Sequence, residues 1–340
     1  MSYNAIVLKQ YPDDFINEET FETKTFEAQP LQKGEFRVKV SHVSLDPVMR
    51  DWVDPNSDSE IPPVQLDEIM RSRGCGEVVE SLNDSFPVGS PVAGMTGWAE
   101  QVVSKGEEIS MLPHGVDSDM ALTTYGIPGL TAFFGYAEIL DAPERQRRAH
   151  QIGEKQTILV TSAAGAVGSI VVQMAIADGL HVVALAGNDE KINWLKDELG
   201  VHAAINYKTE NVSEALTEAA PNGIDLFFEN TGGNTQHTIM QHMNPHGKIA
   251  VCGSIADSHR KEPAPSPSWV QLIKRRVSVE GFAITDQRYR YPVLKAGLMP
   301  YLGDNKIKHR TQVLEGMESA KLGINMLFQG ENQGKLIVKL

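Results

Sequence analysis

Residues 157–191 contain the pattern that most restricts the fold of this 340-residue chain. An apolar run over residues 157–161 leads into a turn over residues 162–168, and a second apolar run covers residues 181–186. The turn fits the G-x-G-x-x-G spacing, with Ala163 in the first glycine slot. Gly165 would let the backbone approach a pyrophosphate, and Gly168 would let the following helix, whose N–H groups attract phosphates, pack closely on its strand. The pattern predicts a βαβ unit that binds a dinucleotide.

The end of the second apolar run indicates which dinucleotide is preferred. In NAD-binding domains a carboxylate at this point binds the ribose 2′-OH and repels a 2′-phosphate. Here the residue is Gly187, and a cation, Lys191, follows one helical turn later. Asp189 and Glu190 fall in the first turn of the next helix, where acids are stabilised in any case. The sequence therefore favours NADP over NAD.

Composition narrows the class of protein. The chain is 41% hydrophobic and 22% charged, as in ordinary globular proteins, and its net charge of -13 disfavours a nucleic-acid partner. One basic group precedes Gly153, and we interpret it as a solvated surface insertion, with a docking patch as the alternative; it consists of Arg145, Arg147, Arg148 and His150.

The cysteine content and the first residues of the chain indicate a cellular compartment. Cys75 and Cys252 alone make neither a disulfide framework nor a zinc site, and they fit a reducing compartment. Residues 1–10 lack the basic and apolar segments of a signal peptide, and no apolar run reaches membrane-spanning length. We expect a cytoplasmic protein that has no membrane partner.

Turn chemistry and periodicity predict two domains. The first 120 residues read as short strands separated by Pro, Gly, Asn and Asp, whereas strands and helices alternate from there to about residue 305. Residues 224–229 and 248–252 resemble buried parallel strands, and residues 335–339 a final strand that returns to the first domain. We expect an α/β fold in which a Rossmann domain, residues 126–307, with a doubly wound parallel sheet, is joined to a β-rich domain of residues 1–125 and 308–340.

Metal catalysis is not predicted. A catalytic zinc needs about three Cys, His or carboxylate ligands around an open position. Only His242 and His246 in the local group with His237 have i,i+4 spacing, and Pro245 interrupts a helix between them. Without a Lewis acid, a developing oxyanion must be stabilised by hydrogen bonds, which suits saturation of an activated C=C bond. The expected chemistry is therefore hydride transfer to an enone or quinone.

Several motifs in order resemble one family along nearly the whole chain, the zinc-independent medium-chain reductases. This family is typified by prostaglandin reductases, plant alkenal double-bond reductases and bacterial curcumin reductase. The matching segments are residues 44–50, 74–81, 94–98, 126–132, 206–208, 229–233, 251–255, 281–282 and 332–335. The resemblance implies a GroES-like β-rich catalytic domain. It also implies NADPH-dependent reduction of the C=C bond of small α,β-unsaturated aldehydes and ketones, in a cytosolic homodimer.

The resemblance also implies the residues that bind cofactor. Those expected at the pyrophosphate are Gly165, Ala166, Val167 and Gly168, and those expected around the 2′-phosphate are Asn188, Lys191 and Tyr207. Those expected along the nicotinamide half are Asn230, Cys252, Gly253, Ser254, Ile255, Ser258, Phe282, Ala283, Ile284 and Asn332. Simpler roles remain open for three of them: Tyr207 as a strand-end aromatic, Asn230 as a turn residue and Lys191 as a solvated lysine.

The chain departs from the family pattern at two positions. Many relatives have tyrosine where this chain has Val48 and Ser258. We assign no catalytic residue from sequence, and Ser258, His259 and Tyr125 remain the candidates for stabilising the enolate. Two alternatives to an enone reductase stay open, namely an NADPH quinone oxidoreductase and a catalytically idle NADP-binding regulator.

Overall fold

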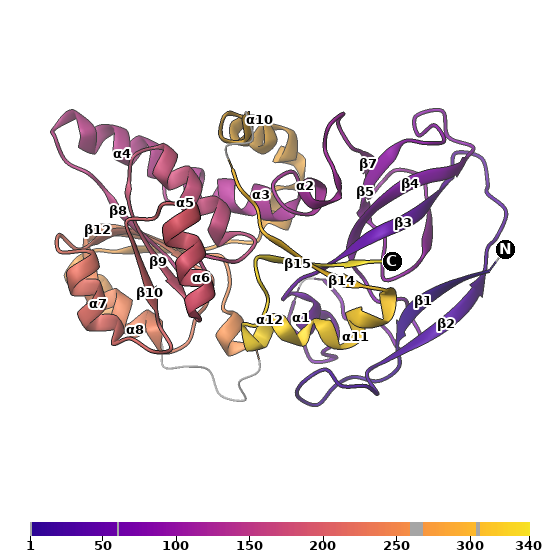
Figure 1. The fold of residues 1–340 in the computed structure, drawn as a ribbon, viewed down its shortest axis with the longest axis horizontal. Helices are drawn as coiled ribbons and strands as arrows, with labels where there is room; N and C mark the ends of the chain where they lie inside the picture. Colours follow the sequence, from indigo (N-terminus) through magenta and orange to yellow (C-terminus); the bar gives the residue numbers. More distant parts are fainter. Residues whose placement is uncertain (1, 60, 259–267, 304–306) are drawn as a thin grey trace. The chain divides into compact units, whose positions relative to one another are not determined.

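The computed structural model describes the whole chain except residues 1, 60, 259–267 and 304–306. Its residues form two compact units (Figure 1). One unit contains Met1–Leu122 and Thr311–Leu340, and the other contains Thr123–Arg310. Within the described residues, no helix has the length and apolar character needed to cross a bilayer.

The second unit is built on a six-stranded parallel sheet. Its strands are β8 (Thr157–Val160), β9 (His181–Ala186), β10 (Ala203–Asn206), β11 (Ile224–Glu229), β12 (Met243–Val251) and β13 (Ser278–Gly281). Their spatial order is β10-β9-β8-β11-β12-β13. In this doubly wound order, the strands that follow β8 are added on one side of it, and the strands from β11 onward are added on the other side. Ligands are expected at the carboxyl ends of β8 and β11, where the order changes. The predicted Rossmann sheet is confirmed.

Alternate side chains of these strands enter two different cores, because successive residues of a strand face opposite sides. Ile158, Val160 and Phe228 belong to one core, whereas Leu159 and Phe227 belong to the other. Helices α5 and α6 cover the first face and α7 and α8 the second (Figure 1). The helices of this unit are α3 (Ile127–Phe133), α4 (Ala142–Gln151), α5 (Gly168–Ala177), α6 (Asp189–Asn193), α7 (Val212–Ala219), α8 (Thr235–His242), α9 (Trp269–Arg275) and α10 (Tyr291–Leu302).

Helix α4 carries the basic group that the sequence suggested as a surface insertion. It is a regular surface helix, with Ala142 and Ala149 buried on its inner side. Glu144 pairs with Arg147 at 2.6 Å and with Arg148 at 2.7 Å, so its single negative charge offsets part of the positive charge of this group. This local pairing weakens the docking-patch alternative.

The first unit contains a seven-stranded sheet and a hairpin. The sheet order is β14-β15-β3-β4-β5-β7, with β6 paired to β3, and β1 pairs with β2. Its strands are β1 (Ser2–Leu8), β2 (Phe21–Glu27), β3 (Phe36–Leu45), β4 (Arg73–Ser81), β5 (Pro91–Met95), β6 (Gln101–Ser104), β7 (Ile109–Met111), β14 (Thr311–Glu315) and β15 (Lys335–Lys339). The short helices are α1 (Met49–Trp52), α2 (Ser118–Leu122), α11 (Ala320–Gly323) and α12 (Asn325–Gln329).

The C-terminal strand completes this unit, as the sequence predicted. Strand β15 runs antiparallel to β3 and parallel to β14. Lys335 at its start is buried, and its ammonium group donates to Leu45 O at 2.9 Å and pairs with Asp46 at 2.5 Å. Asp46 is also the acceptor for the Ser44 hydroxyl. Lys335 holds the pKa of Asp46 below its usual range even though burial of the carboxyl acts in the opposite direction.

Candidate cofactor site

The glycine turn between β8 and α5 has the close packing that the fingerprint requires. A Cβ on Gly168 would lie 2.4 Å from Ser162 O and 2.9 Å from Ala163 Cα, both of which are backbone atoms. The turn is closed by a hydrogen bond of 2.8 Å from Gly165 N to Ser162 O. Ser162 itself adopts a positive φ of 45°, a conformation more usual for glycine. Strain in the turn therefore falls on a serine that sequence reasoning did not single out.

The start of α5 is available for an anion. Among the described residues no side chain caps this helix, which begins after Val167. Ala166 and Val167 are half-buried, and Gly165 to Gly168 form the backbone of the turn. Because the first N–H groups of a helix attract anions, this turn is compatible with the pyrophosphate that the sequence predicts here.

The end of β9 brings a hydroxyl and a cation against Gly187. A Cβ on Gly187 would lie 2.9 Å from the Tyr207 hydroxyl and 3.1 Å from Lys208 Cε. The Asn188 side chain caps α6 by accepting a hydrogen bond of 2.9 Å from Lys191 N. Tyr207 comes directly after β10, the neighbour of β9 in the sheet. A side chain at position 187 would push against the ends of Tyr207 and Lys208, whose hydroxyl and ammonium groups suit a phosphate.

A second lysine contributes to this cluster. Burial and, to a smaller extent, the positive charge of Lys208 together lower the pKa of Lys191 to about 8, and Glu190 acts in the opposite direction. Lys208 was quoted in a sequence motif but was not predicted as a binding residue. Its proximity follows from the register of β9 and β10, which the sequence does not reveal.

A buried carboxyl shapes the turn after β11. Glu229 is fully buried, and its Oε1 accepts hydrogen bonds from the Thr161 hydroxyl at 2.5 Å, Thr231 N at 2.6 Å and Gly232 N at 3.2 Å. Its Oε2 is buried without a hydrogen-bond partner among the described residues. Burial raises the pKa of Glu229, and the three donors act against that rise. Glu229 was part of a sequence motif and was not predicted to have a role of its own.

Asn230 is fixed by the neighbouring strand. Its Nδ2 donates to Thr161 O at 2.8 Å, and its backbone N donates to the Thr161 hydroxyl at 2.9 Å. The hydroxyls of Ser162 and Thr231 lie 3.0 Å apart and tie the same two loops together. The side chain of Asn230 is thus oriented at the reversal point between β8 and β11, which is where a doubly wound sheet binds its ligand.

The loop after β12 is tied to the same turn. Asp257 Oδ2 accepts hydrogen bonds from Gly233 N at 3.0 Å and from the Ser254 hydroxyl at 2.5 Å. Ala256 N donates to Thr231 O at 2.8 Å. The loops that follow β8, β11 and β12 therefore form one hydrogen-bonded floor at the carboxyl edge of the sheet. We call these residues the nicotinamide floor: Thr161, Ser162, residues 229–233 and residues 252–257.

Cys252 and its neighbours continue this floor. Cys252 N and Gly253 N donate to Glu229 O at 2.8 Å and 3.2 Å. Burial, together with the nearby charge of Glu229, raises the pKa of the Cys252 thiol to about 12, so this thiol stays protonated. Ile255 begins a single turn of 3₁₀ helix that ends at Ser258. His259 lies outside the described residues.

Phe282 packs on the core of the second unit and stays partly exposed. Its ring lies against those of Phe134 and Phe228 at centroid distances of 5.5 Å and 6.3 Å. Ile284 is buried in the same core and Ala283 is exposed. The cofactor contacts expected at these three residues stay predictions.

For Tyr125, Asn332 and Val48 the structure gives only the immediate surroundings of each residue. The Tyr125 hydroxyl lies 3.5 Å from Met299 Sδ. Asn332 belongs to the first unit, where its Nδ2 donates to Gly334 O at 2.8 Å. Val48 is 39% exposed in that unit. The residues predicted at the pyrophosphate and at the 2′-phosphate thus all lie in the second unit. Their roles, like those of Tyr125 and Asn332, stay predictions.

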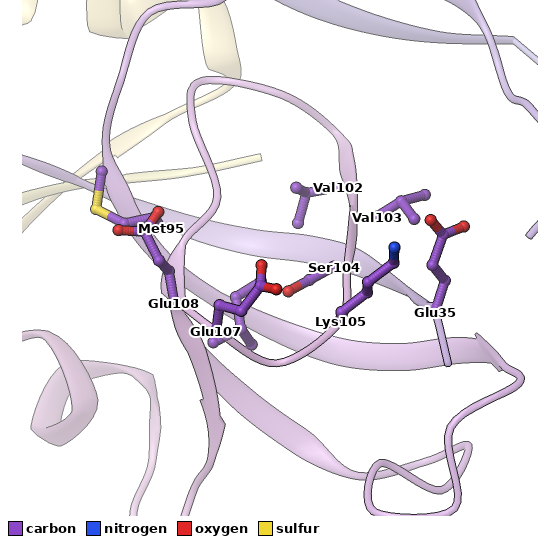
Figure 2. Close-up of a pocket in the computed structure, with 9 residues that line it drawn as sticks. Glu35, Met95, Val102, Val103, Ser104, Lys105, Glu107 and Glu108 are labelled. Carbon is purple, nitrogen blue, oxygen red and sulfur yellow. The ribbon is translucent and has the colours of Figure 1, made fainter. Parts of the chain in front are cut away.

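A hollow of about 440 Å³ in the first unit does not involve these residues (Figure 2). It is lined mainly by residues of β6 and the loop leading to β7, including Lys105, Glu107 and Glu108. None of the site residues predicted from sequence lines it. We assign it no part in cofactor binding.

The described residues also contain no group of three or more His, Cys, Asp or Glu side chains arranged to hold a metal. His242 ends α8, and its ring lies 3.2 Å from the Ser213 hydroxyl. His246 lies in β12, where its ring accepts a hydrogen bond from Arg276. Both histidines therefore contact polar groups unrelated to a metal.

Comparisons with known proteins agree with this arrangement. Residues 4–112 match a family model described as the N-terminal domain of oxidoreductase, and residues 166–296 match one described as zinc-binding dehydrogenase. The chain is 35% identical to prostaglandin reductase 1 of Bos taurus, with 98% of this chain and 97% of that protein covered. It is 32% identical to a 2-alkenal reductase (NADP(+)-dependent) of Nicotiana tabacum, covering 99% and 97% of the two chains.

A solved structure is also similar over the full length. The crystal structure of CurA from Vibrio vulnificus in complex with NADPH matches with a TM-score of 0.89 at 31% identity, covering 99% of this chain and 98% of that one. Sequence and structure thus point to the same group of proteins. The chain belongs to the zinc-independent medium-chain dehydrogenases and reductases, in the branch that includes the prostaglandin and 2-alkenal reductases.

Proposed function

We propose that the protein is an NADPH-dependent reductase of the C=C bond in small α,β-unsaturated aldehydes and ketones. The observation that carries the proposal is the 2′-phosphate cluster at the end of β9, where Lys191, Tyr207 and Lys208 surround a glycine in place of an acid. The substrate class follows from the similarity to a prostaglandin reductase and a 2-alkenal reductase.

The chain's own residues would hold the cofactor in three places. The turn from Gly165 to Gly168 would bind the pyrophosphate, and the cluster around Gly187, with Asn188 capping the helix that carries Lys191, would bind the 2′-phosphate. The nicotinamide floor, with Asn230 oriented by Thr161, would support the nicotinamide half. Bound there, NADPH supplies a hydride for the β-carbon of the unsaturated carbonyl.

The enolate oxygen then needs fixed hydrogen-bond donors. Two tyrosines of many relatives are replaced here by Val48 and Ser258, so this chain must use other donors. Ser258, His259 and Tyr125 remain our candidates. We therefore expect a substrate preference that differs from that of relatives with tyrosine at both positions.

The proposal is tested by following NADPH oxidation with matched acceptors. The panel pairs each enal or enone with the saturated carbonyl of the same chain length and adds quinones. We expect turnover with the unsaturated member of each pair. Activity confined to saturated carbonyls would refute the proposal, activity confined to quinones would favour a quinone oxidoreductase, and NADPH binding without any turnover would favour a regulator.

We also propose a homodimer formed along β13, in a cytosolic protein. Strand β13 ends the sheet of the second unit, and all four of its residues are exposed. Beside it, α9 packs inward through Leu272 but leaves Trp269 79% exposed and Ile273 75% exposed. An exposed strand edge flanked by large apolar side chains favours pairing with another strand, and a second copy offers the same edge about a two-fold axis.

Light scattering after gel filtration tests the dimer. We expect Trp269→Glu combined with Ile273→Glu to give a monomer, while Val88→Glu, at an apolar position of the first unit that is 63% exposed, leaves the dimer intact. A wild-type monomer, or a double variant that remains dimeric, would contradict the assignment.

A further inference from the structure

The two acids that follow the tip of β9 are both engaged by other side chains. Asp189 and Glu190 open α6, two and three residues after Gly187, in the region where NAD-binding domains place an acid that repels the 2′-phosphate. Asp189 Oδ1 accepts a hydrogen bond of 2.7 Å from Asn206, and Glu190 Oε1 lies 2.5 Å from the guanidinium of Arg310. A preference for NADPH requires that these charges do not oppose the phosphate.

Asn206 contacts both Asp189 and the turn that contains Lys208. It ends β10 opposite Ala186 of β9 and is buried. Its Nδ2 donates to Asp189, and its Oδ1 accepts from Lys208 N at 3.2 Å. Its own backbone N donates to Glu210 Oε1 at 2.5 Å, which fixes the residue from a third direction. One carboxamide therefore joins the acid on α6 to the turn that carries Tyr207 and Lys208.

Arg310 holds the second acid from a segment that is itself anchored. Its guanidinium lies 5.9 Å from the centre of the Trp194 ring. Two residues earlier, Lys308 exchanges backbone hydrogen bonds of 2.8 Å with the side chain of Gln173 on α5. The pair with Glu190 is partly exposed, so we expect a smaller effect from it than from the Asn206 contacts.

We propose that Asn206 is a positioning residue that sets the preference for NADPH, with Arg310 in a lesser role. Asn206 holds the Asp189 carboxylate against the end of β10 by hydrogen bonding and, through the Lys208 backbone, holds the tyrosine and lysine at the 2′-phosphate. Arg310 neutralises Glu190. This inference rests on the proposed use of NADPH, and neither residue needs to touch the cofactor.

The first test is Asn206→Asp, which keeps the shape and the acceptor for Lys208 N but places a second carboxylate against Asp189. We expect the dissociation constant for NADPH to rise about tenfold, because a charge-assisted hydrogen bond is lost and like charges face each other, while that for NADH changes by less than about twofold. The exchange Asp189→Asn with Asn206→Asp recreates the hydrogen bond in the opposite direction, and it should recover most of the loss.

The second test uses the exposed pair, which leaves the buried contacts intact if Asn206→Asp fails to fold. Arg310→Met should weaken NADPH binding about two- to fivefold, as expected for an exposed charge pair, and Glu190→Gln added to it should restore binding. Titrations of cofactor fluorescence give both dissociation constants.

Selective loss of NADPH binding with rescue in either pair supports the proposal. Equal losses for NADPH and NADH, or no rescue in both pairs, would overturn it. A wild-type protein that binds NADH as tightly as NADPH would refute the cofactor assignment itself, a result that is distinct from the behaviour of the variants.

Discussion

The lowered pKa of Lys191 leads to a specific prediction about cofactor binding and pH. The pKa is about 8 in the protein without cofactor because the ammonium is partly buried and lies near the positive charge of Lys208. A 2′-phosphate beside Lys191 favours the charged form and must raise this pKa. Above pH 8, NADPH binding therefore takes up a proton at Lys191, and affinity falls as pH increases.

The size of the effect follows from the fraction of Lys191 that is charged before binding. That fraction falls about tenfold between about pH 7 and pH 9 for a pKa near 8, so the NADPH dissociation constant should rise about tenfold over the same range. Below about pH 6 the phosphate itself becomes protonated and affinity should fall again. NADH lacks the phosphate and should show neither change.

Fluorescence titrations across this pH range provide the assay. Lys191→Arg stays charged throughout and should remove the decline above pH 8, whereas Lys191→Met should bind NADPH about ten- to a hundredfold more weakly near neutral pH. Lys196→Met, an exposed lysine nearby, is the matched control and should behave as wild type. If NADH follows the same pH curve as NADPH, or Lys191→Met retains the decline, the reasoning is wrong.

Substitutions at three further positions, Gly168, Glu229 and Lys208, test the glycine turn, the nicotinamide floor and the predicted 2′-phosphate site. Gly168→Ala places a Cβ against Ser162 O and should lower the free energy of unfolding by about 1–3 kcal/mol, measured by urea titration, whereas Gly303→Ala, with open space around it, should have little effect. Glu229→Ala strands three buried donors and should destabilise by about 1–3 kcal/mol in the same assay, and Glu229→Gln, which keeps an acceptor, should lose less. Lys208→Met should weaken NADPH binding about tenfold without affecting NADH, and an equal loss for both would remove Lys208 from the phosphate site.

The parts of the site that could be predicted from sequence are those made by neighbours along the chain. The turn from Gly165 to Gly168 depends on local backbone geometry, and its spacing identifies it directly. The buried strands β11 and β12 and the final strand β15 were found from their apolar runs. These features are set within short segments, so the pattern of residue types is sufficient to find them.

The rest depends on contacts between segments far apart in sequence. Lys208 and Asn206 reach the β9 tip only because β10 pairs with β9 in a particular register. Glu229 has a role because burial and the turn after β11 bring three donors to one oxygen. The ring of Phe282 packs beside Gly135, where a Cβ would lie 2.7 Å from it. The family pattern marks Phe282 as a position of interest, but it does not reveal this packing contact.

The nicotinamide floor has a consequence for how such enzymes can diverge or be redesigned. Its three loops share hydrogen bonds through Glu229, Thr161 and Asp257, so none of them adopts its shape alone. A single loop transplanted from a relative would therefore lack the hydrogen-bond partners that its two original neighbouring loops supplied. Changes of substrate range in this scaffold should therefore be inherited as coordinated sets of substitutions across all three loops, and laboratory grafts should succeed only when the three are moved together.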